Sequence, residues 1–279
     1  MNPCSRTAPC KTFAGAISKT ATNGEISVLD PGGFGAVTIT KSITIDGTNG
    51  AGFGSILAAG TNGILINITN TADTNSTVIL RNLSINGFST GLNGIRILAA
   101  RSVIIEETEA FGFRGSSTSR GISDERQAPG NLAVSNSSFT NNSQVGIAIV
   151  SPNRSRITAV LDNVLVHGNG TGLSLAFNAG VTVTDSAITA NTTDLGFGIV
   201  VQHNGTEVQL ARTVIAGNGT VGLRLQTESP TVRISETMIV DNAGAGVSVG
   251  GGTFRSWGNN RIAGNADDST PGGSIIPQQ

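Results

Sequence analysis

A glycine followed by an aliphatic residue recurs through most of this chain, and no other feature constrains the fold as strongly. Successive copies lie 24 to 31 residues apart. Each copy begins a stretch in which apolar and polar residues alternate, and a second alternating stretch follows, as in "VTVTDSAITAN" and "VQLARTVIAGN". Two such stretches recurring in phase indicate a repeat architecture. The eight glycines are Gly63, Gly94, Gly121, Gly146, Gly172, Gly198, Gly222 and Gly246.

Alternation with a period of two predicts short β-strands that each bury one face. A repeat of this length leaves no room for a crossover helix, so equivalent strands of successive repeats must pair directly and in register. The sequence therefore predicts an all-β solenoid of nine to ten coils. The residues expected to point inward are Ile64/Ile66, Ile95/Ile97, Ile147/Ile149, Leu173/Leu175, Ile199/Val201, Leu223/Leu225 and Val247/Val249 in the first strands, and Val181/Val183/Ile188, Val208/Leu210/Ile215 and Val232/Ile234/Ile239 in the second stretches.

Polar residues recur at two further fixed places in the repeat. Asparagines three residues after a buried position predict a column at a bend, where asparagine tolerates a left-handed backbone and its amide can bond from coil to coil. This first column holds Asn142, Asn169, Asn191, Asn218, Asn242 and Asn265, with Phe88 and Phe113 at the matching places of two earlier coils. The second column holds Asn82, Glu107, Asn136, Asn163, Asp185, Arg212, Glu236 and Asn259. Arg212 between Asp185 and Glu236 predicts an ion-pair ladder.

The repeated motif "G-I-x-I … V-T-V-T-D-S-x-I-x-x-N" resembles right-handed parallel β-helix proteins of the pectin-lyase-like superfamily over about residues 25 to 265. The segment "PCKTFAGAISKTATNGEISVLDPG" is similar to the opening of that family. The resemblance implies a right-handed solenoid whose first coil is covered by a short helix over residues 11 to 19, with Phe13, Ala16 and Ile17 facing the core. It also implies an extended acidic polysaccharide as the partner. Because this fold hosts many activities, the resemblance specifies the fold more closely than the function.

We expect a single β-helix domain over residues 1–279. Residues 1–24 would form an N-terminal segment with the cap helix, residues 25–265 the coils, and residues 266–279 a C-terminal cap. A cap at each end covers apolar surface and an unpaired strand edge. Trp257, expected in the column of Leu210 and Ile234, would cover the last coil together with Ile275 and Ile276.

The two cysteines, Cys4 and Cys10, lie close together near the N-terminus. A disulfide between them would fix this segment in an oxidising compartment, and two free thiols are the alternative. Met1 is not followed by a basic region and an apolar region, so the sequence shows no signal peptide. The remaining composition is typical of a mature secreted chain, and we expect a secreted, periplasmic or cell-surface location.

Charge is sparse: 13% of the residues are charged and the formal net charge is −1. This balance provides no broad electrostatic surface for nucleic acid. No apolar run approaches the length of a membrane span, so we expect no membrane insertion. Outward apolar residues, among them Leu65, Leu98, Val150 and Val200, favour self-association through an outer sheet face. The histidines, His167 and His203, lack partners at metal-ligand spacing, and we expect neither a metal nor a cofactor.

The stretch "GISDERQAPG", residues 121–130, breaks the repeat. Register places Asp124 in the column of Ile97 and Ile149, which would put a carboxylate in the core. An unpaired buried carboxylate is costly, so either a partner lies beside it or the strand ends after Ile122 and a solvated loop carries the charges. If the chain has a site, we expect Asp124 and Glu125 as its catalytic carboxylates and Arg96, Arg120 and Arg126 as its substrate-binding cations.

Three functions remain open at this point. The outward columns of the first strands lack the stacked carboxylates of calcium-assisted lyases and the acidic cluster of polygalacturonase-like hydrolases. This favours a secreted or surface protein that binds an extended polysaccharide, or a non-catalytic adhesion or structural module. A polysaccharide lyase or glycoside hydrolase acting on an acidic polysaccharide is the alternative.

Overall fold

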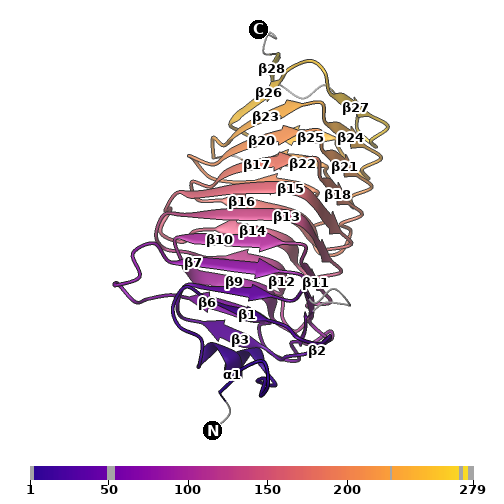
Figure 1. The fold of residues 1–279 in the computed structure, drawn as a ribbon. Coiled ribbons are helices and arrows are strands. Elements are labelled where there is room, and N and C mark those ends of the chain that lie inside the picture. The colour runs from indigo at the N-terminus through magenta and orange to yellow at the C-terminus, as the bar shows by residue number, and fades with distance from the viewer. Residues whose placement is uncertain (1–2, 49–53, 227, 270–272, 276–279) are drawn as a thin grey trace.

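The computed structural model describes residues 3–48, 54–226, 228–269 and 273–275. The chain winds into a solenoid of about nine turns, with its two termini at opposite ends of the rod (Figure 1). Every paired strand of the described coils runs parallel to its neighbours, as the repeat predicts, and the predicted right-handed parallel β-helix is confirmed. The single helix of the described residues lies at the N-terminal end. None of their helices is long and apolar enough to cross a membrane.

The first strand of each turn contributes to a nine-stranded sheet of the described residues. Each glycine–aliphatic motif lies at the start of one of these strands or just before it, and the strands pair in register along the rod. The strands are β3 (Val37–Ile39), β6 (Ile64–Asn67), β9 (Asn93–Ala99), β12 (Arg120–Asp124), β14 (Val145–Val150), β16 (Thr171–Ala176), β19 (Ile199–Val201), β22 (Leu223–Leu225) and β25 (Val247–Val249).

The remaining described strands form a nineteen-stranded sheet, which is bent along its length into two rows. The first row holds β1 (Gly24–Ser27), β4 (Ile43–Asp46), β7 (Thr77–Arg81), β10 (Ser102–Glu106), β17 (Gly180–Thr184), β20 (Glu207–Ala211), β23 (Thr231–Ser235), β26 (Thr253–Ser256) and β28 (Ser274–Ile275). The second row holds β2 (Gly32–Gly33), β5 (Gly54–Leu57), β8 (Leu83–Asn86), β11 (Glu109–Phe111), β18 (Ala187–Thr189), β21 (Val214–Ala216), β24 (Met238–Val240) and β27 (Arg261–Ala263). Two long strands, β13 (Gly130–Thr140) and β15 (Ile157–His167), belong to both rows.

The bend between the rows lies at the second polar column. Asn136 and Asn163, within the two long strands, have φ angles of 48° and 52°. The same left-handed backbone occurs at Asn82, Glu107, Asp185, Arg212 and Glu236. Asparagine and aspartate adopt this conformation most readily, because their short side chains can bond locally, and at this bend Glu107, Arg212 and Glu236 adopt it as well. The prediction of a left-handed backbone at the asparagines of the first column is wrong: there the left-handed residue is the one before each asparagine, such as Asn141 before Asn142.

The core between the sheets consists of the predicted aliphatic residues. The inward pairs of β6, β9, β14, β16, β19 and β22 are fully buried, and so are the three aliphatic residues predicted in each second stretch. At the C-terminal end the burial decreases, since Val247 is buried but Val249 is only partly covered. The register predicted from the alternation of apolar and polar residues is therefore confirmed along the rod as far as β22.

The glycine at each strand start has a steric cause. At Gly198, an added Cβ would lie 2.5 Å from the carbonyl oxygen of Gly222 and 2.8 Å from Nδ2 of Asn218. Both distances are too short for a carbon atom, so any side chain would push the next coil or its asparagine away. The repeated glycine and the repeated asparagine are thus two parts of one close contact between coils.

The first asparagine column forms a continuous amide ladder inside the bend. Nδ2 of Asn169 donates to Oδ1 of Asn191 at 3.0 Å, and the backbone N–H of Asn169 donates to the same oxygen at 2.9 Å. The pattern repeats at each asparagine from Asn142 to Asn242. The ladder begins at the backbone N–H of Phe113 and ends where Asn265 donates to the carboxylate of Asp268.

The N-terminal helix α1 (Phe13–Ile17) covers the first coil as predicted. Phe13, Ala16 and Ile17 are buried, and Oγ1 of Thr12 accepts a hydrogen bond from the Gly15 N–H to cap the helix. Cys4 and Cys10 form a disulfide, with their Cα atoms 4.7 Å apart, just before the helix.

The C-terminal end differs from our expectation. Ile234 pairs with Ser256, so Trp257 lies one position beyond the predicted column and is only partly buried. Ile275 is 74% exposed instead of covering the core, and Ile276 lies outside the described residues. The predicted register fails here because the last turns contain few aliphatic residues to fix it. Of the predicted ion-pair ladder, only the Arg212–Asp185 pair forms within the described chain.

Candidate functional site

Strand β12 continues through the stretch that breaks the repeat. It pairs with β9 and β14 as far as Asp124, opposite Ile97 and Ile149, so the interpretation that the strand ends after Ile122 is wrong. Successive side chains of a strand point to opposite faces. Asp124 accordingly points into the solenoid, whereas Ser123 and Glu125 point outward.

Inside the solenoid, Asp124 forms an ion pair with Arg126. Their side chains are 0% and 1% exposed, and Nη2 of Arg126 lies 2.6 Å from Oδ2 of Asp124. Nε of Arg126 donates to Oδ1 of the same carboxylate at 2.9 Å. This two-pronged geometry is the strongest that arginine and a carboxylate adopt.

The rest of the Arg126 guanidinium also bonds to the protein. Nη1 donates to the carbonyl oxygens of Ala100 and Asn131, each at 3.1 Å. The carbonyl of Ala100 belongs to the turn between β9 and β10, and that of Asn131 lies at the start of β13. The pair therefore joins adjacent coils, and with almost no exposed surface it does not contact a ligand on the outside.

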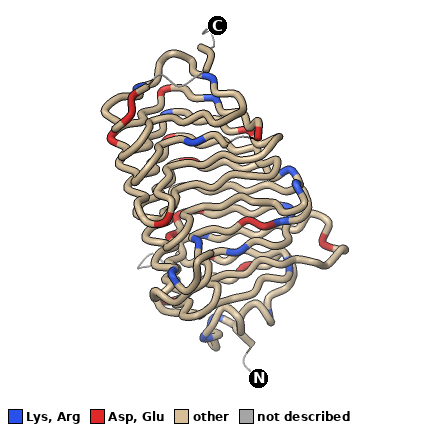
Figure 2. The backbone as a smooth tube through the Cα atoms, turned by 180° about the vertical axis from the view of Figure 1, so that it is seen from behind, with Lys and Arg blue, Asp and Glu red and all other residues tan. Residues whose placement is uncertain are grey.

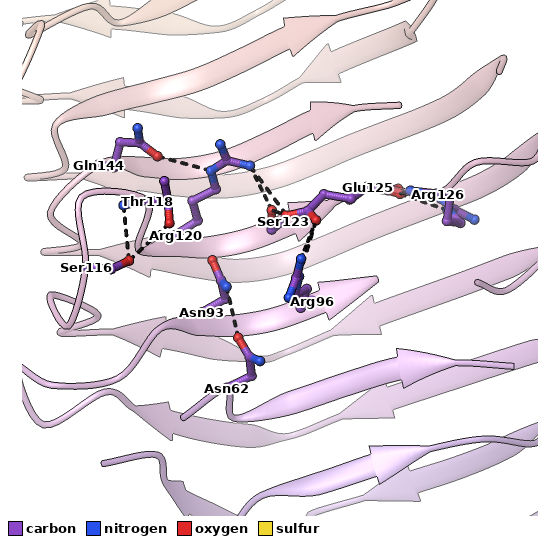
Figure 3. Close-up of polar contacts among 11 residues, drawn as sticks. Asn62, Asn93, Arg96, Ser116, Thr118, Arg120, Ser123, Glu125, Arg126 and Gln144 are labelled. Atoms are coloured by element: carbon purple, nitrogen blue, oxygen red, sulfur yellow. Dashed lines mark hydrogen bonds and ion pairs between the residues drawn. The ribbon is translucent and has the colours of Figure 1, made fainter. Parts of the chain in front are cut away.

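On the outer face, Glu125 is the centre of a second network, which we call the arginine–glutamate cluster: Arg96, Arg120, Ser123 and Glu125 (Figure 3). Nη2 of Arg96, on β9, donates to Oε2 of Glu125 at 2.7 Å. Oγ of Ser123 donates to Oε1 at 2.6 Å. The cluster thus connects two neighbouring coils across the surface of the sheet.

Arg120 is held from two sides at the start of β12. Its Nη1 donates to Oγ of Ser123 at 2.9 Å and lies 3.8 Å from Oε1 of Glu125. Its Nε donates to Oε1 of Gln144 in the next coil at 3.2 Å. Arg120 is 19% exposed and Arg96 is 38% exposed, so both guanidinium groups reach solvent from fixed positions.

Electrostatics keep this cluster charged. Burial raises the pKa of the Glu125 carboxyl, but hydrogen bonds from Arg96 and Ser123 and the charges of Arg96 and Arg120 outweigh it, so the pKa lies below its ordinary value. Burial lowers the pKa of Arg120, with Arg96 adding to the effect and Glu125 opposing it. With one carboxylate between two guanidinium groups, the cluster has a net charge of about +1 near neutral pH.

The predicted site residues are therefore divided by the strand. Arg96, Arg120 and Glu125 meet outside, whereas Asp124 and Arg126 meet inside. Sequence reasoning did not identify the roles of Ser123 and Gln144. The outward register of Ser123 beside Glu125 could have indicated the first. Gln144 precedes the residue that pairs with Arg120, which is a signal visible only once the register is known.

Beyond the cluster, the outer face of the nine-stranded sheet carries little charge. Arg96 is followed in register by Ser123, Ala148, Ser174, Val200 and Arg224. The Arg224 guanidinium lies 5.1 Å from the centre of the Phe197 ring. Figure 2 shows that charged residues are scattered sparsely along the whole chain. The cluster is therefore a local concentration of charge on a mostly neutral strip.

Other polar places on the rod are occupied by contacts within the protein. A groove of about 770 Å³ follows the bend between the two rows and is lined by the second polar column. Several of its side chains bond to one another: Nη2 of Arg212 lies 2.7 Å from Asp185, and Nδ2 of Asn163 donates to Asn136 at 2.8 Å. Within the described residues, no group of three histidine, cysteine or acidic side chains has the geometry to hold a metal ion.

Comparisons with known proteins agree with this architecture. A family model described as a right handed beta helix region matches residues 148–276. The chain is similar to the A-module of mannuronan C-5 epimerase AlgE6 from Azotobacter vinelandii, with 15% identity, a TM-score of 0.56, and coverage of 95% of this chain and 94% of that one. It is similar to the AlgE4 A-module of the same organism, with 16% identity, a TM-score of 0.55, and coverage of 95% and 93%.

The chain is also similar to pectate lyase Pel9A, with 12% identity, a TM-score of 0.57, and coverage of 95% of this chain and 76% of that one. A search of curated protein sequences gives no significant match. At these identities the solved structures establish a shared fold.

Proposed function

We propose that this right-handed parallel β-helix protein binds an extended acidic polysaccharide along the outer face of its nine-stranded sheet. In the proposal, Arg96 and Arg120 hold a uronate carboxylate. Structurally similar proteins are named for mannuronan and pectate, both acidic polysaccharides, which supports this class of ligand. The disulfide between Cys4 and Cys10 supports a secreted, periplasmic or cell-surface location for the encounter.

The arginine–glutamate cluster carries the proposal. Arginine donates in a planar fork that matches the geometry of a carboxylate, and less of its side-chain entropy is lost when neighbours already fix it. Arg120 is fixed by Ser123 and Gln144, and Arg96 by Glu125. Because the two guanidinium groups share one carboxylate, the cluster keeps an unbalanced positive charge, which attracts an anion.

The flat, mostly uncharged strip beyond the cluster fits a long chain. Coils stack about 4.8 Å apart, so outward positions recur at regular intervals along the rod. Ser123, Ala148 and Val200 have at most 3% exposed surface, which leaves the arginines as the main groups of this column that reach solvent. Arg224 stands five coils from Arg96 in the same column and offers a second cation to the same chain. The ligand in the proposal therefore lies parallel to the rod.

Binding without cleavage fits the chemistry of the cluster better than catalysis. A general acid or base works best with a pKa near the operating pH, whereas the pKa of Glu125 is lowered away from neutrality. Glycoside hydrolysis further uses two carboxyl groups on either side of the bond. Asp124, the neighbouring carboxylate, lies on the inner side of the strand with no exposed surface. A lyase or hydrolase using Glu125 remains the competing function.

Binding is tested by titrating the purified protein with polymannuronate and with polygalacturonate in a calorimeter, at two salt concentrations. We expect binding to one or both that weakens with salt and is lost when the uronate carboxyl groups are esterified. Arg96→Ala and Arg120→Ala should each weaken it at least tenfold. Arg212→Ala, which also removes an arginine paired with an acid but on another face, is the matched control and should bind as the wild type does.

Mixtures of the protein with each polyuronate are also assayed for cleavage, through new reducing ends and new double bonds. Absence of cleavage with retained binding supports the binding role. Cleavage that is lost in Glu125→Gln with binding unchanged would replace it with the catalytic role. No binding to either polyuronate, or equal binding to the esterified chains, contradicts the proposal.

A further inference from the structure

The outer face of the first row carries one uninterrupted column of side chains. Register from strand to strand connects these residues through ten consecutive coils. The column reads Glu25, Thr44, Ile79, Ile104, Ala133, Val160, Thr182, Gln209, Arg233 and Arg255. It lies on the side of the rod that faces the viewer in Figure 1, where β7, β10, β13, β15 and β17 cross the picture.

The middle of this column is apolar and open to solvent. Ile79, Ile104, Ala133 and Val160 follow one another in four successive coils, and Val160 is 45% exposed. A β-branched residue on a solvated sheet face gains from burial against a second flat surface. Such a contiguous stripe on a soluble protein indicates an interaction surface.

The two ends of the column have opposite charge. Glu25 opens it, with Asp46 one coil later in the adjacent column, whereas Arg233 and Arg255 close it. Among the described residues, none of these four side chains takes part in an ion pair. This column is therefore acidic at its N-terminal end, apolar in the centre and basic at its C-terminal end, while the adjacent outward column carries the Arg81–Glu106 ion pair and Asp162 beside the apolar stripe.

We propose that a second copy of this chain packs against this face in antiparallel orientation. A two-fold axis running between β13 and β15, parallel to the strands, places coil one opposite coil ten and coil two opposite coil nine. Glu25 then faces Arg255 of the other copy, and its Arg233 lies opposite Thr44, one column from Asp46, with each contact occurring twice. Ala133 lies on Val160 at the axis. A parallel arrangement would instead bring like charges together at both ends, so the charges favour the antiparallel one.

The face is close in size to one side of a specific dimer interface. Ten coils at about 4.8 Å and strands of five residues at about 3.3 Å give a rectangle of roughly 45 by 15 Å, or about 700 Å². Specific interfaces bury about 800 Å² per partner. The face belongs to the nineteen-stranded sheet, whereas the proposed polysaccharide surface belongs to the nine-stranded sheet. The dimer and the polysaccharide site are therefore independent proposals.

A charge swap tests the pairing. The purified full chain is examined by sedimentation velocity over a range of concentrations, at low and high salt. We expect a concentration-dependent dimer whose dissociation constant rises with salt. Glu25→Arg and Arg255→Glu should each raise the dissociation constant at least tenfold, because each places like charges together twice. The double variant Glu25→Arg/Arg255→Glu restores opposite charges and should recover most of the affinity.

Val160→Lys tests the centre, since it places two ammonium groups across the axis, and we expect it to abolish the dimer. Leu195→Lys is the matched control: it removes an aliphatic residue that is 57% exposed, away from this face, and should dimerise as the wild type does. Circular dichroism verifies that each variant is folded. A monomer at all concentrations overturns the proposal, and so does a dimer that is indifferent to Val160→Lys or is not recovered by the charge swap.

Discussion

Replacing Arg126 with methionine should destabilise the protein more than any other single loss of charge. The substitution keeps most of the side-chain volume but leaves the Asp124 carboxylate, which has no exposed surface, without its cation. It also removes the donor that two carbonyl oxygens, of Ala100 and Asn131, share at 3.1 Å. The coil that contains β12 should therefore lose the side-chain contact that joins it to the preceding coil.

The magnitude follows from the burial. Removing one partner of a buried ion pair costs about 3–5 kcal/mol, because the remaining charge is neither hydrated nor paired. Replacing both partners, in Asp124→Leu/Arg126→Met, removes that charge and leaves only the two carbonyl groups without a donor, which costs about 1–3 kcal/mol. The double variant should consequently be more stable than Arg126→Met alone.

Denaturant unfolding, followed by circular dichroism, measures the stabilities of the wild type, Arg126→Met and the double variant, and so tests their predicted order. Hydrogen exchange over residues 120–131 is recorded in parallel, because long repeat arrays do not always unfold in one step. Arg212→Met is the control: it breaks the pair with Asp185 on the surface, where side chains are 52% and 45% exposed, and should leave unfolding unchanged. An Arg126→Met protein within about 1 kcal/mol of wild type, or a double variant less stable than the single one, would refute the reasoning.

Three further outcomes follow from contacts described above. Ile199→Ala, at a position with no exposed surface, should cost about 2–4 kcal/mol in denaturant unfolding, and a near-neutral result would contradict the register. Gly198→Ala should cost about 1–3 kcal/mol, because its Cβ would lie 2.5 Å from the Gly222 oxygen, and an unchanged melting temperature would count against this close contact. Glu125 has a lowered pKa in the folded protein, so its stabilising contribution is present above its unfolded pKa of about 4.3 and is lost as the pH falls through the lower folded pKa. Glu125→Gln should therefore melt below wild type at neutral pH and match it in acid, and a difference that persists in acid would exclude the ionic explanation.

The fold could be predicted from the sequence because every turn repeats the same physical requirements. Alternation fixes which face is buried, and the stacked asparagines and glycines fix where the chain bends. These signals weaken where aliphatic residues become rare, and there the prediction for Trp257 and Ile275 failed. For Asp124 the repeat left two alternatives, a buried carboxylate with a partner or a solvated loop after Ile122, and the structure has the first of them.

The candidate site could be predicted only in part. The sequence brought five charged residues to one place, but it could not show that consecutive residues Asp124 and Glu125 would separate into an inner and an outer network. Partner choice depended on side-chain reach rather than on pattern: Arg126 turns inward to three acceptor groups, whereas Arg120 is held by Gln144 from the next coil. The contacts of Arg120 with Gln144 and of Arg126 with Ala100 join residues more than twenty positions apart, and such contacts become visible only once the register is known.

The amide ladder has a direction, and this direction gives the rod a beginning and an end. Each asparagine accepts from the coil before it and donates to the coil after it, so any coil of this kind can follow any other. Phe113 supplies only a donor, and Asp268 supplies only an acceptor, whose pKa is lowered by the hydrogen bonds from Asn265. A whole coil could therefore be duplicated or deleted between these two residues without leaving an amide unmatched. Solenoids of this type can therefore change their length in steps of one coil, both in evolution and by engineering.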